Sequence, residues 1–133
     1  LKESYRLNTS KNDARSRLAA IYLEAGNYAE ASVHYKQLVE NSPSDAELRI
    51  GYGLALLKSR ELNLAYQQFK KAAELDKNSA AAAHACLSML EEMRGRLSQA
   101  EKEAKLAQEL DPDSDFFKDN AKRLARSERS NEI

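Results

Sequence analysis

The side chains that could do chemistry are few and widely spaced in this chain of 133 residues. There are two histidines, His34 and His84, and a single cysteine, Cys86. One cysteine allows neither an intramolecular disulfide nor a cysteine-based metal cluster. Because no His or Lys lies in register to activate it, we expect Cys86 to be a small buried hydrophobe rather than a nucleophile. These residues predict neither a metal nor another cofactor.

The acidic residues give no stronger sign of a site. The densest group is Asp111-Pro112-Asp113-Ser114-Asp115, which lacks the spacing, the glycine and the distal glutamate of a calcium loop. A helix end followed by a cap explains this segment, and the pair Glu91-Glu92 is predicted to be surface charge. Since no phosphate-binding loop, nucleophile elbow or metal-binding helix motif is present either, we expect no enzyme.

The charge balance bears on the class of partner. The chain has 21 basic and 21 acidic residues, so its formal net charge is zero, whereas nucleic-acid binders usually carry a basic excess. Its apolar runs fall far short of the ~20 residues that span a membrane. We therefore expect a soluble domain with no nucleic-acid partner and no membrane span. The compartment stays unknown, although the cytoplasm is favoured.

A sequence segment that recurs along the chain predicts the helices that must position any site. The residues around Ala31 recur around Ala65, 34 positions later, and again around Ala100, 35 positions after that. We place the extra residue in the turn Met93-Arg94-Gly95-Arg96, because loops accept insertions more readily than packed helices. A period near 34 residues marks a stacked helical repeat. Such units bury their apolar faces only by stacking, which creates an extended surface rather than a catalytic pocket.

Breaks and caps in the sequence predict where the helices lie. Asn27 with Glu30 and Ser44 with Glu47 have the spacing of capping boxes, and Pro43 ends a helix. The expected helices span residues 12–24, 27–40, 45–58, 62–75, 79–92, 97–110 and 114–126.

Small and large residues alternate in register in three consecutive units. The first has Leu18, Ala19, Tyr22, Gly26, Tyr28, Ala31, Tyr35 and Pro43; the second Tyr52, Gly53, Leu56, Ala65, Phe69 and Ala72; the third Leu87, Leu90, Gly95, Leu97, Ala100, Ala107 and Pro112. This pattern resembles the tetratricopeptide repeat family. The resemblance implies an all-α, right-handed superhelix of antiparallel helix pairs with about seven helices. Its repeats would be 12–45, 46–79 and 80–114, followed by a capping helix (114–126) and a frayed tail (127–133).

Several positions depart from the family pattern. Arg60 replaces the turn glycine of the second unit, and Ala104 replaces the aromatic residue of the other units. Our hypothesis is that Phe116 or Phe117 fills the volume next to Ala104. At the other end, residues 1–11 fit the remnant of a preceding repeat, with Thr9 at its proline position; a frayed tail is the alternative.

In this family the first helix of each pair lines a concave groove that binds partner peptides. By repeat position, the resemblance assigns to the groove Asp13, Ser16, Arg17, Ala20 and Glu24; Glu47, Ile50, Leu54, Leu57 and Lys58; and Ala81, His84, Ser88, Glu91 and Glu92. Ala20, Ile50, Leu54 and Ala81 would form an apolar floor within a mildly acidic rim, which favours an apolar or basic peptide. The alternatives are a solvated face and a groove filled by a further repeat or another chain. His84 is either a polar anchor there or an ordinary half-exposed residue, and His34 is expected on the outer side.

The resemblance implies a non-catalytic scaffold that binds a peptide or helix of another protein. Some family members grip a chaperone's terminal carboxylate, but the matching positions here are Ser16, Ala20, Leu54, Ala81 and Ala85, which offer no cation. We therefore expect no such capture. The alternatives are self-association into a homo-oligomer and, third, an RNA-binding helical repeat.

Overall fold

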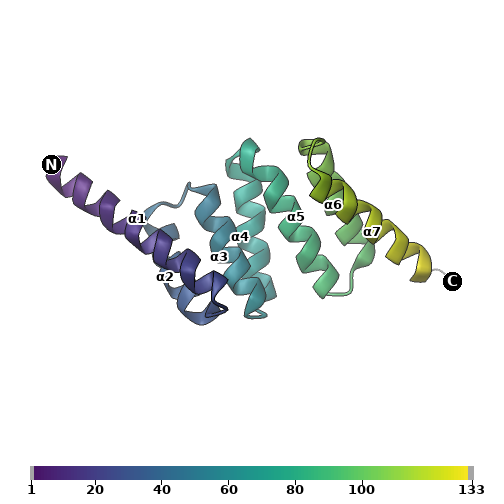
Figure 1. The fold of residues 1–133 in the computed structure, drawn as a ribbon, viewed down its shortest axis with the longest axis horizontal. Helices are drawn as coiled ribbons and strands as arrows, with labels where there is room; N and C mark the ends of the chain where they lie inside the picture. The colour runs from purple at the N-terminus through teal and green to yellow at the C-terminus, as the bar shows by residue number, and fades with distance from the viewer. Residues whose placement is uncertain (1, 132–133) are drawn as a thin grey trace.

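The computed structural model describes the backbone of residues 2–131 and the side chains of residues 12–127. Within these residues the chain is all-α and forms seven helices: α1 (Lys2–Glu24), α2 (Tyr28–Asn41), α3 (Ala46–Lys58), α4 (Leu62–Leu75), α5 (Lys77–Met93), α6 (Leu97–Leu110) and α7 (Asp115–Asn131). Each helix packs against the next one in sequence, so the helices form one row from α1 to α7 (Figure 1). The predicted fold class of sequential antiparallel pairs is confirmed.

The helix ends differ from the prediction at both termini. The backbone is helical from Lys2 without a break at Thr9, so α1 does not begin at Asn12. At the other end α7 continues past Arg126 to Asn131. The side chains of residues 1–11, on which the repeat-remnant interpretation depends, and residues 132–133 of the expected tail lie outside the described residues.

The two predicted capping boxes are also wrong. Asn27 makes no side-chain hydrogen bond to the start of α2. At α3 the cap is Asp45 rather than Ser44, and its Oδ1 accepts a hydrogen bond from the backbone N–H of Leu48 at 3.2 Å. Asp76 plays the same part at α5, because its Oδ1 accepts from the N–H of Asn78 at 2.9 Å. An aspartate at a helix start satisfies a free N–H and complements the helix dipole.

Each helix pair turns through a left-handed residue. Gly26 and Gly95 have φ of 83° and 78°, and Arg60 has φ of 67° at the matching place in the second turn. Glycine adopts this conformation without steric cost, whereas a side chain with a Cβ does not. All three turns have three residues, at 25–27, 59–61 and 94–96. The extra residue of the third unit is therefore not in its turn, and that prediction is wrong.

Buried small residues show where the extra residue lies. Ala19 and Ala31, Gly53 and Ala65, and Ser88 and Ala100 are each 12 residues apart and buried. In the third pair the Ser88 hydroxyl donates a hydrogen bond to the carbonyl of Ala100 at 2.8 Å. Ser88 therefore corresponds to Gly53, and the extra residue lies between α4 and the middle of α5.

Two polar contacts between paired helices give the same register. The Arg49 guanidinium donates to the Gln68 amide oxygen at 3.0 Å, from α3 to α4. His84 Nδ1 lies 2.6 Å from Glu103 Oε2, between α5 and α6. Both partners of the second contact lie 35 residues after those of the first. From His84 onward the third unit is thus displaced by 35 residues, so the extra residue lies before His84.

Two glycines of α3 allow aromatic rings from both neighbouring helices to approach its backbone. A Cβ on Gly51 would lie 2.5 Å from Cε1 of Tyr35 in α2, and one on Gly53 would lie 2.5 Å from Cε1 of Phe69 in α4. Phe69 is fully buried and Tyr35 nearly so. Since real Cβ atoms essentially never come this close, each ring occupies the volume that any other residue would need.

The space beside Ala104 is filled differently from our hypothesis. Ala104 packs in one buried cluster with Ala100, Ala121 and Leu124, of which the last two come from α7. Phe116 is 67% exposed, and its ring packs edge-on against Phe117 with 5.8 Å between centroids. Neither phenylalanine belongs to this cluster, so the assignment to Phe116 or Phe117 is wrong. Leu124, which is fully buried, takes that role.

Replacing Gly53 with leucine should lower the free energy of unfolding by about 1–3 kcal/mol, because the new side chain competes with the Phe69 ring. Urea denaturation measures the change. Lys71→Leu, at an exposed position of α4, is the control and should differ little from the wild type. An unchanged midpoint for Gly53→Leu would contradict the close approach.

Replacing Arg60 with glycine should raise the free energy of unfolding by roughly 0.5–1 kcal/mol. The substitution removes the steric cost of holding a residue with a Cβ at positive φ. This gain exceeds the loss that arises because glycine makes the unfolded chain more flexible. Ser59→Gly is the matched control, because Ser59 has a φ of −82° and no such penalty. Thermal melts compare the two, and equal effects would show that Arg60 is not strained.

Candidate functional site

The predicted groove residues of α1 share one side of the helix. Asp13, Arg17 and Glu24 are exposed, while Ser16 and Ala20 are half-buried beside them. The backbone of α1 presents them at helical spacing, so a ligand lying along this side could contact all five. The structure therefore leaves the first part of the predicted site accessible.

In α3 four of the five predicted residues are accessible. Glu47 and Lys58 are exposed, and Ile50 and Leu54 are half-buried, with their inner sides packed on the hydrophobic core. Leu57 is only 2% exposed and belongs to that core together with Leu56 and Phe69. A ligand cannot reach it without displacing core side chains. The assignment of Leu57 to an open surface is therefore wrong.

In α5 the predicted residues turn away from that surface. Ala81, Ser88 and Glu91 are buried, and Ser88 is engaged by its hydrogen bond to α6. His84 is half-buried and occupied by Glu103 of α6. Because the third unit is offset by one further residue, Ser88 and His84 contact the partner helix α6, and Ala81 and Glu91 are buried rather than open to a ligand.

The residues one position later take their place. They are Ala82, Ala85, Met89, Glu92 and Met93, the last being 40% exposed. Ala82 is exposed, Met89 and Glu92 are half-buried and Ala85 is buried. Exposure along α5 thus resembles that of the matching positions in α3, which are Glu47, Ile50, Leu54, Leu57 and Lys58. Sequence reasoning missed Ala82, Met89 and Met93. The spacing of 12 residues from Ser88 to Ala100, shared with the first two units, is the signal that could have found them.

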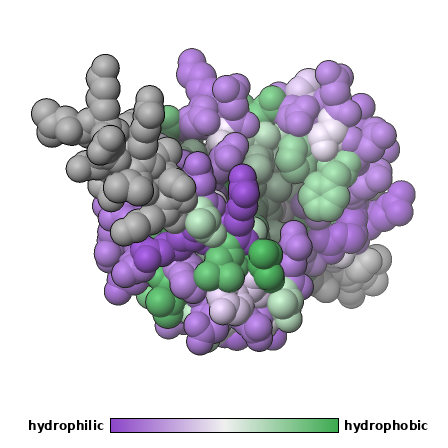
Figure 2. Space-filling model, turned by 60° about the vertical axis from the view of Figure 1, so that its left-hand side comes forward, coloured by the Kyte–Doolittle hydropathy of each residue, from purple (hydrophilic) through white to green (hydrophobic). Residues whose placement is uncertain are grey.

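We call this surface the first-helix face. It consists of Asp13, Ser16, Arg17, Ala20, Glu24, Glu47, Ile50, Leu54, Lys58, Ala82, Met89, Glu92 and Met93, with the buried Ala85 beneath them. Its middle is apolar, and α3 and α5, which carry most of that middle, contact each other. Figure 2 shows hydrophobic residues gathered in patches between hydrophilic ones on the side of the molecule that it presents.

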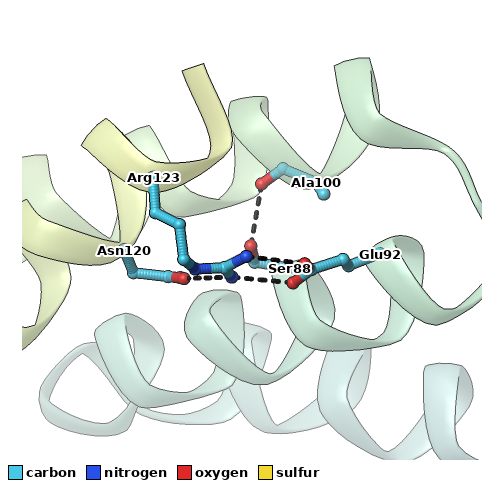
Figure 3. Close-up of polar contacts among 5 residues, drawn as sticks. All are labelled: Ser88, Glu92, Ala100, Asn120 and Arg123. Atoms are coloured by element: carbon cyan, nitrogen blue, oxygen red, sulfur yellow. Dashed lines mark hydrogen bonds and ion pairs between the residues drawn. The ribbon is translucent and has the colours of Figure 1, made fainter. Parts of the chain in front are cut away.

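An ion pair joins α7 to this face (Figure 3). The Arg123 guanidinium donates to both carboxylate oxygens of Glu92 at 2.7 Å and to the Asn120 side-chain oxygen at 2.9 Å. The hydrogen bonds from Arg123 hold the pKa of Glu92 below its ordinary value, although partial burial opposes them. The same bonds raise the pKa of Arg123. This bidentate pair links α7 to α5 at one end of the first-helix face.

The buried carboxylate of Glu91 has its own partners. Arg94 donates to it at 2.9 Å, and an Arg96 nitrogen lies 3.7 Å away. Arg94 also donates to Asn63 of α4 at 2.8 Å and lies over the Tyr66 ring, 5.6 Å from its centroid. A buried charge is tolerated when it is paired in this way. Glu91 therefore holds Arg94, which links the third turn to α4 of the second unit. Glu91 is not open to a ligand, so its assignments to the groove and to surface charge are wrong.

The remaining reactive side chains have structural surroundings. Burial raises the pKa of the Cys86 thiol to about 12, so the thiolate that would react is scarce at neutral pH. The ring of His34 stacks on Tyr22 of α1, with 5.5 Å between centroids and 4° between planes. His34 is thus half-buried against the first helix and not on the outer side as expected.

The described residues hold little further chemistry. Among the described residues no group of three or more His, Cys, Asp or Glu side chains could hold a metal ion. No helix in the described part of the chain combines the length and the apolar character needed to cross a membrane.

Comparison with known families identifies the fold. Residues 22–90 match the model of the tetratricopeptide repeat, and this match spans more than half of the chain. The chain therefore belongs to the tetratricopeptide repeat family. It matches none of the curated proteins with which it was compared.

Solved structures with the same fold are remote in sequence. The second such domain of human RPAP3, in complex with the HSP70 peptide SGPTIEEVD, is 18% identical, with a TM-score of 0.77 over 88% of this chain and 97% of that one. The Yersinia enterocolitica secretion chaperone SycD, in complex with a peptide of the translocator YopD, is 21% identical, with a TM-score of 0.76 over 88% of each chain. The domain of Sgt2 from Aspergillus fumigatus is 17% identical, with a TM-score of 0.82 over 92% and 83%. These similarities show the fold.

Replacing Arg123 with alanine should lower the free energy of unfolding at pH 7 by less than about 1 kcal/mol, because the pair is partly exposed. Since the folded state lowers the pKa of Glu92, the contribution is complete above the ordinary value of 4.5 and is lost as the pH falls through the lowered one. Urea denaturation across this range measures the wild-type and variant curves, which should converge in acid. Lys122→Ala, at the exposed neighbouring residue, is the control. A difference that persists in strong acid would contradict the assignment.

Proposed function

We propose that this chain is a non-catalytic interaction domain that binds a segment of a partner protein along the first-helix face. The observation that carries the proposal is the row of Ile50, Leu54 and Met89, which are half-buried on two helices in mutual contact. Apolar side chains fixed at one end and open at the other suit the anchor residues of a peptide or helix.

The physics of the fold supports binding by a preformed surface. Ile50, Leu54 and Met89 all pack against the buried cluster that contains Leu56, Phe69 and Leu87, so their rotamers are restricted before any partner arrives. A surface that is already ordered loses little conformational entropy on binding. Met93, which is 40% exposed, adds a flexible, polarizable side chain that can adapt to a ligand's shape.

The charges on this face limit the chemistry of the segment. Asp13, Glu24 and Glu47 are exposed along it, together with Arg17 and Lys58. The mildly acidic balance favours a segment with apolar anchors and a few basic residues.

Capture of an acidic carboxyl terminus fits poorly. The peptide bound by the human RPAP3 domain ends in EEVD, and a terminal carboxylate is best recognised by Lys or Arg. The inner positions of the first-helix face here are Ser16, Ala20, Leu54 and Ala85, none of which is cationic. We therefore propose an internal apolar segment as the ligand.

Selecting binders from a peptide display library, and measuring their affinity by calorimetry, tests this function. Leu54→Arg and Met89→Arg should each weaken a selected peptide at least roughly tenfold, because each buries an unpaired charge. Leu64→Arg, at an exposed leucine of α4 outside the first-helix face, is the matched control and should leave the affinity unchanged.

Two further results would contradict the proposal. One is that peptides selected on the wild type bind Leu54→Arg and Met89→Arg with unchanged affinity. The other is that SGPTIEEVD binds more tightly than any apolar peptide, which would assign the face to carboxylate capture instead.

A further inference from the structure

A second apolar surface lies at the opposite side of α1 from the core. Leu18 is 40% exposed and Ile21 is 60% exposed, and Ala14 and Ala25 are exposed on the same side. Among the described helices α1 packs mainly on α2 and, less extensively, on α3, and it lies at the outer end of the row in Figure 1. Figure 2, which brings this end forward, shows hydrophobic residues at the surface among hydrophilic ones.

The spacing of these four residues is that of a helix-pairing seam. The steps from Ala14 to Leu18, Ile21 and Ala25 are four, three and four residues, which keep apolar side chains on one stripe facing a second helix. The two large side chains lie in the middle of the stripe, and the two alanines lie at its ends. We call these four residues the α1 seam. Ala25 is the first residue of the turn after α1, and its N–H donates to the carbonyl of Ile21 at 2.9 Å, so it continues the helical spacing.

The charges beside the α1 seam are self-complementary. Arg17 and Glu24 are both exposed and lie on the same flank, seven residues apart. On the other flank Arg15 and Tyr22 are half-buried toward the molecule itself. The exposed flank therefore carries a positive charge near one end and a negative charge near the other.

An antiparallel second copy satisfies both patterns. A two-fold axis between Leu18 and Ile21 sets Leu18 against the partner's Ile21 and Ala14 against the partner's Ala25. The same axis brings Arg17 beside the partner's Glu24, and symmetry makes this contact twice. A parallel pairing would instead set Arg17 beside the partner's Tyr22, with no acidic partner.

We propose that the α1 seam joins two copies of this chain as an antiparallel, two-fold symmetric pair. The inference does not rest on the function proposed for the first-helix face, although the two surfaces share Arg17 and Glu24. The seam is short for a stable interface, so we expect a weak pair that forms and separates reversibly.

Sedimentation velocity of the 133-residue chain over a range of concentrations tests the pair. The wild type should pass from monomer to dimer, and Ile21→Lys should remain a monomer because it places a charge in the seam. Leu64→Lys, at an exposed leucine of α4, should dimerise like the wild type. Circular dichroism confirms that each variant is folded.

Charge reversal tests the orientation. Arg17→Glu and Glu24→Arg should each raise the dissociation constant by roughly tenfold, since each turns two attractions into repulsions. The double variant should regain the wild-type value. An equimolar mixture of the two single variants should form a heterodimer, because both of its cross-contacts are attractive.

Two results would overturn the proposal. A wild type that stays monomeric throughout would leave the seam for another occupant, such as a further helix of a longer chain. Dimers that ignore both charge reversals would place the contact elsewhere or in another orientation.

Discussion

The structure depends on how closely neighbouring helices approach at small residues. Gly51 and Gly53 let the rings of Tyr35 and Phe69 reach the backbone of α3 from both sides. A close-packed interior cannot absorb an added atom at such a point without moving its neighbours. The small residues therefore set the rotation of each helix about its own axis, and that rotation decides which side chains reach solvent.

The third unit shows what this constraint does to a site. Ser88 takes the place of Gly53, and its hydroxyl uses the short distance to hydrogen-bond the Ala100 carbonyl. Packing this position against α6 rotates α5, so Met89 reaches the first-helix face while His84 turns to Glu103. The offset of one residue thus places the apolar, polarizable Met89 on the first-helix face and removes the polar His84 from it.

The sequence was sufficient for the number, type and order of the helices, because apolar periodicity and the breaks near Gly26 and Gly95 are local signals. It was insufficient for α5. Residues 80–87 are small or apolar at every position except His84, so either register offers a plausible buried stripe. The prediction that Phe116 or Phe117 packs beside Ala104 failed for a related reason, since hydrophobicity alone could not show that the smaller Leu124 lies there. Packing across helices, and not local pattern, decided both.

Cysteine accessibility at two adjacent residues tests the rotation of α5 most directly. Ala82 is exposed and Ala81 is 8% exposed, and the native Cys86 is buried, so maleimide reports on a single introduced thiol. Ala82→Cys should react faster than Ala81→Cys by roughly a hundredfold, because the latter reacts only through local opening. Faster labelling of Ala81→Cys would contradict the register on which the first-helix face depends.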